Sequence, residues 1–171
     1  MKLGFFAILA SFGFTLAFFN SHIANADSAP ECMARGQVVT VNNSQVAKWK
    51  VSTPDQFRSR AHVTGVVSRL FSNETGHLHF EVTLDGTDAT LEIIYNQEFG
   101  TVNPPVQVGV RVESCGDYIS APSGGHEPSP DGAILHWVHR SPDPQRHDDG
   151  FVLINGVLYG QDVQAAGNRY N

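Results

Sequence analysis

The sequence predicts an all-β fold, a small OB-like Greek-key barrel of about five strands with an added C-terminal hairpin and a short N-terminal helix. From residue 61 onward, apolar and polar residues alternate with a period of two, which is typical of half-buried strands. Turn signals divide this region into three adjacent segments, an interruption and two further segments. This arrangement favours an OB barrel, because a β-sandwich usually needs more strands.

The expected strands follow the alternation and end at turn residues. They are His62–Phe71, His77–Leu84, Thr90–Tyr95, Gln107–Tyr118, Ala133–His139, Phe151–Ile154 and Val157–Tyr159. In the fourth strand we expect Val108, Val110 and Val112 to point inward. The last two strands flank Asn155-Gly156, a strong signal for a two-residue hairpin turn.

A short helix is expected before the barrel. Thr53-Pro54-Asp55-Gln56 matches the capping-box pattern, with proline at the first helical position, so the helix would run through Arg60. The preceding Asn42–Gln45 segment predicts a turn. We therefore divide the chain into a signal peptide (1–26), an extension packed on the barrel (27–60), the OB-like barrel (61–160) and a flexible tail (161–171).

The first residues are typical of a secretory signal. Lys2 supplies the positive start, Leu3–Phe19 is an apolar stretch, and Ala24-Asn25-Ala26 is a small-x-small cleavage pattern. The alternative is an uncleaved membrane anchor, which the polar residues inside the stretch disfavour. We predict a periplasmic or secreted protein with no membrane span once the signal is cleaved.

Cysteine content and net charge narrow the function classes. Cys32 and Cys115 are the only cysteines, and in an oxidising compartment an even count predicts one disulfide. The chain has 11 Lys and Arg against 17 Asp and Glu, a formal net charge of −6. Non-specific nucleic-acid binding normally requires a basic surface and is not expected. The sequence also lacks a phosphate loop, a dinucleotide fingerprint and a Gly-x-Ser-x-Gly elbow.

The first candidate site is a histidine cluster between the fifth and sixth strands, formed by His136, His139, His147 and Asp149, with Asp148 beside it. On a regular strand His136 and His139 would face opposite ways, but they could converge if the strand ends or bulges between them. Imidazole and carboxylate groups suit zinc or another divalent metal, and one histidine oriented by an aspartate could be a general base. The alternative is that the histidines bond to backbone carbonyls and brace a long loop.

The second candidate site is a polar face formed by His77, His79 and Glu81. Residues two apart on a strand share a face, and the second and third strands of an OB barrel are its usual ligand platform. An ordinary solvated sheet face is the alternative explanation.

One segment resembles a known family. His136-Trp137-Val138-His139, followed by Arg146-His147 and Asp149-Gly150-Phe151, is similar to a pattern in a bacterial family of small secreted proteins of unknown function. The resemblance covers roughly residues 60–160. This chain has Ser141-Pro142 where the family often has Asp-Pro, and its loop before the third histidine is longer. The resemblance implies a secreted OB-like domain and implies no particular reaction.

Three hypotheses for function follow. The first is an exported binding module that holds a divalent metal or an anionic ligand at His136, His139, His147 and Asp149, with a small molecule, an oligosaccharide or another cell-envelope ligand as partner. The second is a hydrolase of phosphodiester or cell-envelope substrates, with His139 or His147 as base, Asp149 as its orienter, and Arg140 or Arg146 near the anion. The third is a structural envelope protein whose histidines only brace a loop.

Overall fold

The computed structural model describes residues 28–73, 75–100 and 102–163. The predicted signal peptide lies outside this range, as do residues 164–171 of the predicted tail. The described elements are β1 (Met33–Ala34), β2 (Gln37–Val38), α1 (Asn43–Ser52), β3 (Arg58–Leu70), β4 (His77–Leu84), β5 (Thr90–Asn96), η1 (Gln97–Phe99), β6 (Arg111–Ser120), β7 (Ala133–His136), β8 (Phe151–Ile154) and β9 (Val157–Tyr159).

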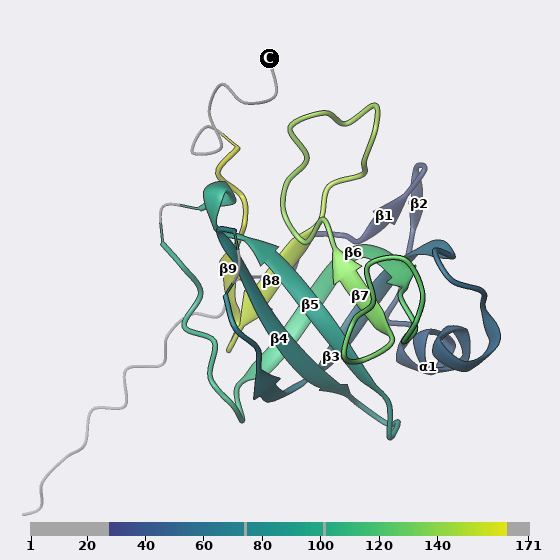
Figure 1. Ribbon diagram of the computed structural model, residues 1–171. Coiled ribbons are helices and arrows are strands. Elements are labelled where there is room, and N and C mark those ends of the chain that lie inside the picture. Colours follow the sequence, from purple (N-terminus) through teal and green to yellow (C-terminus); the bar gives the residue numbers. More distant parts are fainter. Residues whose placement is uncertain (1–27, 74, 101, 164–171) are drawn as a thin grey trace, which may run out of the picture.

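Five strands close into a barrel (Figure 1). Strands β3, β4 and β5 form an antiparallel meander, and β6 returns to pair antiparallel with β3. Strand β7 then lies between β5 and β6, parallel to the first and antiparallel to the second. This order is the five-stranded Greek key of the OB fold. The predicted all-β barrel is confirmed.

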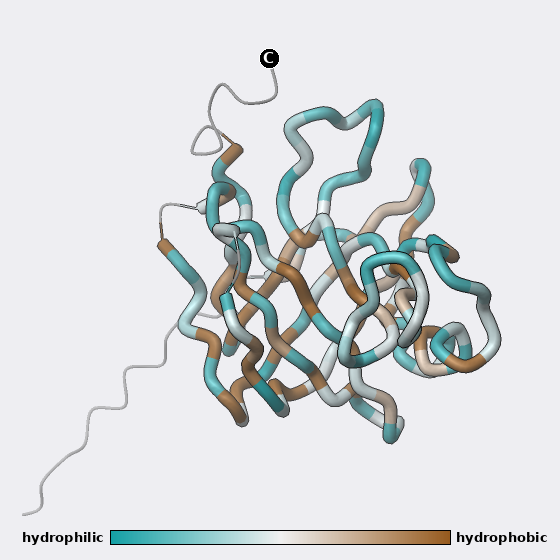
Figure 2. The backbone as a smooth tube through the Cα atoms, viewed as in Figure 1, coloured by the Kyte–Doolittle hydropathy of each residue, from teal (hydrophilic) through white to brown (hydrophobic). Residues whose placement is uncertain are grey.

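The barrel interior is filled by alternate residues of each strand. In β4, Phe80, Val82 and Leu84 are fully buried, as the alternation predicts, and Leu78 packs against the same core. Figure 2 shows the resulting alternation of hydrophobic and hydrophilic positions along the strands. Burial of such side chains contributes about 1.5–3 kcal/mol each. The opposite face of β4, with His77, His79 and Glu81, therefore points out of the barrel.

Strands β7 and β8 occupy the same edge of β6 in succession. Asp117–Ser120 of β6 pair with β7, whereas Val112–Cys115 pair with β8. The chain between them, residues 137–150, leaves the sheet as a long loop that stands beyond the barrel in Figure 1. The β8–β9 hairpin turns at Asn155 and Gly156, which both have positive φ (49° and 80°), as a type I′ turn requires.

A small second core lies on the outer face of β6 and β8. Cys32 and Cys115 form a disulfide there, with Phe151 and Leu153 packed around it. The predicted bridge is confirmed. It joins the segment before α1 to the middle of the barrel.

The predicted helix was placed at the wrong residues. The helix α1 covers Asn43–Ser52, including part of the segment expected to turn. The Thr53 hydroxyl donates to the Trp49 carbonyl and so closes this helix, and Gln56 has a positive φ of 59°. The backbone N–H of Gln56 donates to the Ser120 carbonyl, so pairing beside β6 replaces the second helix.

Several strand boundaries also differ from expectation. Strand β3 starts at Arg58 rather than His62, and β6 ends at Ser120 rather than Tyr118. Residues 107–110 form a turn with Gly109 at a φ of 92°, so β6 starts at Arg111 and Val108 is 62% exposed. Strand β7 ends at His136, because Trp137 adopts a left-handed conformation with a φ of 55°. Within the described residues no helix has the length and apolar character needed to cross a lipid bilayer.

Removing the disulfide should destabilise the barrel strongly. The two cysteines are 83 residues apart, so the double variant Cys32→Ala, Cys115→Ala should lose about 4–5 kcal/mol of unfolding free energy through the larger entropy of the unfolded chain. Urea unfolding of the variant, compared with wild type under oxidising and reducing conditions, measures this loss. A loss below about 1 kcal/mol in the variant would contradict it.

Candidate functional site

A groove lies on the outer face of β4, β5 and β7, with a volume of about 770 Å³. Its floor is formed by paired outward residues of the three strands: His77 and His79, Glu92 and Ile94, Ile134 and His136. Its walls are the β3–β4 connection, with Phe71 and Thr75, and the β6–β7 connection, with Glu127–Pro130. These are the strand face and the two loops with which OB folds bind oligonucleotides and oligosaccharides.

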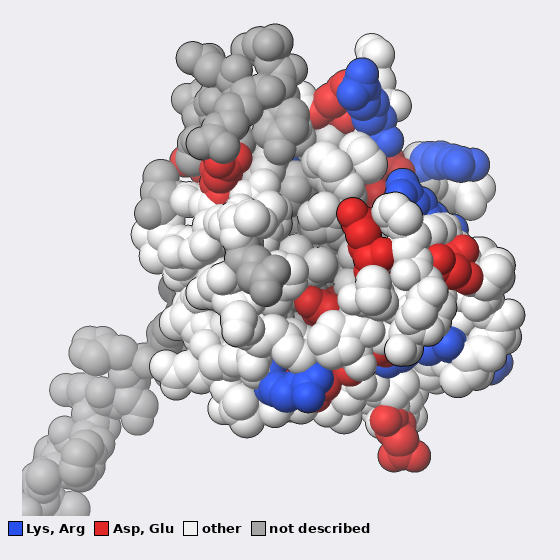
Figure 3. All heavy atoms as spheres, in the orientation of Figure 1, with Lys and Arg blue, Asp and Glu red and all other residues white. Residues whose placement is uncertain are grey.

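The groove carries little positive charge. Within the described part of the chain its lining contains Glu92 and Glu127 and neither lysine nor arginine. The surface over β4 and β5 in Figure 3 consists mostly of side chains other than Lys, Arg, Asp and Glu. Such a groove is poorly suited to a phosphate backbone, which is held by basic side chains.

A buried carboxylate fixes one histidine of the groove. The side chain of Glu92 is only 6% exposed, and its Oε1 lies 2.8 Å from Nδ1 of His79. The other oxygen, Oε2, accepts a hydrogen bond from the Ser129 hydroxyl. Glu92 therefore links the strand floor to the loop that forms one wall.

One member of the first predicted site, His136, lies in this groove beside His77 and His79 of the second. The rings of His77 and His136 lie 6.2 Å apart between centroids, and those of His77 and His79 lie 6.3 Å apart. Nδ1 of His77 is 3.1 Å from the Thr75 carbonyl oxygen. Burial, together with nearby His77, lowers the pKa of His136 to about 4, so its ring is uncharged at neutral pH. The sequence could place His77 and His79 on one face, but not beside His136.

The other members of the predicted cluster are held separately. His139 is 2% exposed, stacks on Phe99 with centroids 3.6 Å apart, and has Nδ1 2.8 Å from the Arg140 carbonyl oxygen. Burial lowers its pKa to about 4. Asp149 accepts a hydrogen bond from the Ser141 backbone N–H. As placed, no group of three or more His, Cys, Asp or Glu side chains within the described residues is arranged to hold a metal ion.

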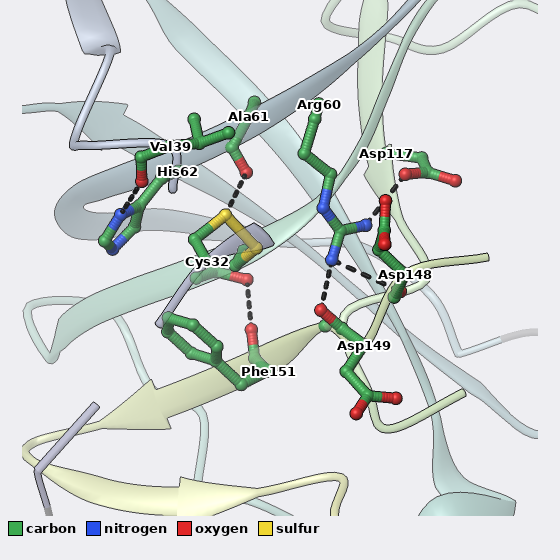
Figure 4. The surroundings of a disulfide bond; sticks show 12 residues. Cys32, Val39, Arg60, Ala61, His62, Asp117, Asp148, Asp149 and Phe151 are labelled. Carbon is green, nitrogen blue, oxygen red and sulfur yellow. Dashed lines mark hydrogen bonds and ion pairs between the residues drawn. A yellow bond between two sulfur atoms is a disulfide. The ribbon is translucent and has the colours of Figure 1, made fainter. Parts of the chain in front are cut away.

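His147 belongs to a third arrangement, centred on a buried arginine. The Arg60 side chain is 6% exposed and contacts Oδ1 of Asp117 at 2.8 Å, while Oδ2 of Asp117 lies 3.1 Å from Nδ1 of His147. Arg60 also donates to the carbonyls of Asp148 and Asp149, as Figure 4 shows. The network joins β3, β6 and the 137–150 loop.

The same loop is fixed at two further points. The ring of His147 stacks on Trp137, with centroids 3.9 Å apart and planes inclined by 15°. The Asp148 carboxylate accepts a hydrogen bond from the Arg35 backbone N–H, which connects the loop to the β1–β2 hairpin. Arg140 and Arg146, the expected anion contacts, are exposed, and Arg146 pairs with Asp143.

Two further acidic side chains, Glu81 and Asp131, lie close to the groove. Glu81 contacts Ser68 and Arg69, and Asp131 contacts Thr90. Burial and the neighbouring Glu81 raise the pKa of Asp131 to about 6. Burial opposes ionisation of Glu81 too, but hydrogen bonds from Ser68 and Asp131 outweigh it and lower the pKa of Glu81. Of these two neighbouring carboxyl groups, Asp131 is therefore the one that keeps its proton in mildly acidic solution.

Sequence reasoning missed Glu92, Asp117 and Arg60. Glu92 had one visible signal, since it is a carboxylate within the apolar run Leu91–Tyr95, and a buried charge needs partners. Asp117 and Arg60 sit on different strands, and only the β3–β6 register, which sets them opposite each other, brings them together.

No protein-family model matches the chain, and no curated protein matches it. The resemblance to a bacterial family of small secreted proteins therefore stays a prediction that rests on the pattern from His136 to Gly150.

Asp117→Ala should destabilise the protein by about 2–4 kcal/mol, because it leaves the buried Arg60 guanidinium without its carboxylate. Arg146→Ala is the matched control. It removes the exposed pair with Asp143 and should cost less than about 0.5 kcal/mol. Urea unfolding followed by circular dichroism compares the two variants, and equal losses would contradict the role given to Arg60.

Asp131→Asn should stabilise the protein relative to wild type, increasingly so as the pH rises from about 4 to 6. The pKa of Asp131 is raised from 3.8 to about 6 on folding, so wild-type stability falls across this window as the folded carboxyl ionises. An amide cannot ionise, so the stability of the variant does not carry this loss. Unfolding free energies at several pH values measure the effect, with exposed Asp88→Asn as control. A stability difference that stays constant with pH would refute it.

Proposed function

We propose that this protein is an exported β-barrel binding module that holds an uncharged, hydroxyl-rich ligand, such as a cell-envelope oligosaccharide, in the groove over β4, β5 and β7. The observation that carries the proposal is the position of the groove. It uses the strand face and both loops that OB folds use for ligands, and its 770 Å³ falls within the usual range for ligand sites.

The lining matches the chemistry of a sugar. Glu92, Ser129 and the groove histidines offer hydrogen-bond acceptors and donors for hydroxyl groups, while Phe71, Ile94 and the proline residues of the 127–130 wall offer apolar surface. The two glutamates disfavour an anionic ligand, because the described lining contains no lysine or arginine to balance its charge.

Export is supported by two features. The disulfide between Cys32 and Cys115 is of the kind that persists in oxidising compartments. The sequence of residues 1–26 matches a signal peptide. A periplasmic or secreted location is therefore part of the proposal.

A hydrolase is the second candidate, because the Asp117–His147 pair orients one ring nitrogen of a histidine and leaves the other available as a base. In this version Asp117, rather than Asp149, is the orienting residue. The hydrolase candidate requires turnover of a substrate in addition to its binding.

Titration calorimetry with a panel of uncharged, soluble envelope oligosaccharides, in the presence of a chelator, tests the binding proposal. We expect at least one glycan to bind below millimolar concentration. Glu92→Gln and Phe71→Ala should each weaken binding about tenfold or more, because a hydrogen bond to a charged group contributes about 1.5–3 kcal/mol and apolar contact a similar amount.

Val108→Ala, at an exposed position outside the lining, is the control and should bind like wild type. Chromatography of the titrated glycans distinguishes the candidates, since cleavage products would favour the hydrolase. Absence of binding by the whole panel would overturn the binding proposal.

A further inference from the structure

A second, smaller cavity adjoins the groove. It has a volume of about 230 Å³ and lies between β4, the β3–β4 connection and the segment that precedes β6. We propose that this cavity, the apolar hollow, binds an alkyl or acyl chain carried by the saccharide that occupies the groove. The inference rests on the proposed function and adds the chemical class of its ligand, an uncharged amphiphile.

The lining of the apolar hollow is mostly hydrophobic. Six of its eight lining residues have apolar side chains: Leu70, Phe71, Leu78, Phe80, Pro104 and Val106. Leu78 and Val106 pack against the barrel core, in which Phe80 is fully buried. The described lining contains no lysine, arginine, aspartate or glutamate. Transfer of an aliphatic group from water to such a surface is favourable.

Two residues connect the apolar hollow to the groove. Phe71 and His79 line both cavities, and the Phe71 backbone N–H donates to the His79 carbonyl at 3.0 Å. The Arg69 guanidinium covers the Phe71 ring, with its Cζ 4.4 Å from the ring centroid, and it also pairs with Glu81. The ring at the boundary is therefore held in place, and one ligand can contact both cavities around it.

The size of the apolar hollow favours a substituent over a separate ligand. Sites for small molecules usually measure about 300–1,000 Å³. The groove, at about 770 Å³, falls within this range, whereas the hollow, at about 230 Å³, falls below it. We therefore expect the sugar in the groove and its chain in the hollow.

Titration calorimetry with alkyl glucosides, maltosides and N-acetylglucosaminides tests the proposal. Their chains run from methyl to octyl, and each is used below the concentration at which it forms micelles. We expect the affinity to rise about fourfold with each added CH₂ group, since burial of one such group contributes about 0.8 kcal/mol, and to level off once the hollow is full. Free alkanols of the same length should bind much more weakly, because they lack the sugar.

Two variants test the hollow itself. Val106→Phe should fill it and weaken binding of the octyl glycoside at least tenfold, the equivalent of about two buried CH₂ groups. Leu70→Ser, at a position that is 49% exposed, should remove part of the apolar wall and weaken the same binding about fourfold or more. Both variants should bind the methyl glycoside like wild type.

Val108→Phe is the matched control. It makes the same change two residues further along, at an exposed position outside both linings, and should keep the full dependence on chain length. Melting temperatures show whether each variant is folded. If Val106→Phe is not folded, the exposed Leu70→Ser variant still decides the question.

The proposal is overturned if affinity does not change with chain length, if alkanols bind as tightly as glycosides, or if Val106→Phe and Val108→Phe lose the same affinity. Binding of unsubstituted oligosaccharides without any effect of chain length would refute the hollow alone and leave the groove proposal standing. Failure of the whole oligosaccharide panel and of every alkyl glycoside would refute both.

Discussion

One edge of strand β6 is shared by two strands, and this sharing determines where the candidate side chains lie. Strand β7 pairs with the end of β6 and β8 with its beginning, so the chain must leave the sheet after His136 and return at Phe151. The two strands meet where Gly116 and Gly150 lie, and a Cβ atom at either position would collide with a neighbouring backbone carbonyl. The close passage of these backbones therefore requires glycine.

The loop that this exit creates is held by polar contacts as well as by the burial of Val138 in the main core. Arg60 bridges from β3 to Asp117 and to two loop carbonyls, and it satisfies backbone acceptors that have no strand to pair with. A buried guanidinium is costly to desolvate, so it is stable here only because several acceptors surround it. The contact of His147 with Asp117 belongs to the same network, which gives that histidine a structural role whether or not it has a chemical one.

The barrel could be predicted from the sequence because alternation and turn residues are local signals. Strand β4 and the Asn155-Gly156 hairpin match their predicted bounds for that reason. The helix was misplaced because Thr53 can close one helix as readily as open another, and pairing with β6 decided between them. The site was harder to predict, because the conformation of Trp137 separates His136 from His139, and only the closed barrel brings His136 beside His77.

The outer face of β4, β5 and β7 has features that stability alone does not favour. Glu81 and Glu92 lie directly opposite each other on β4 and β5, an arrangement of like charges that destabilises a sheet. The two carboxylates are compensated separately, Glu81 by Ser68 and Arg69 and Glu92 by His79 and Ser129. Apolar residues in place of Glu81 and Glu92 would need no hydrogen-bond or ion-pair partners to pack on this face. A recessed strand face that carries hydrogen-bond acceptors and imidazoles beside two connecting loops is the arrangement on which the proposed ligand site rests.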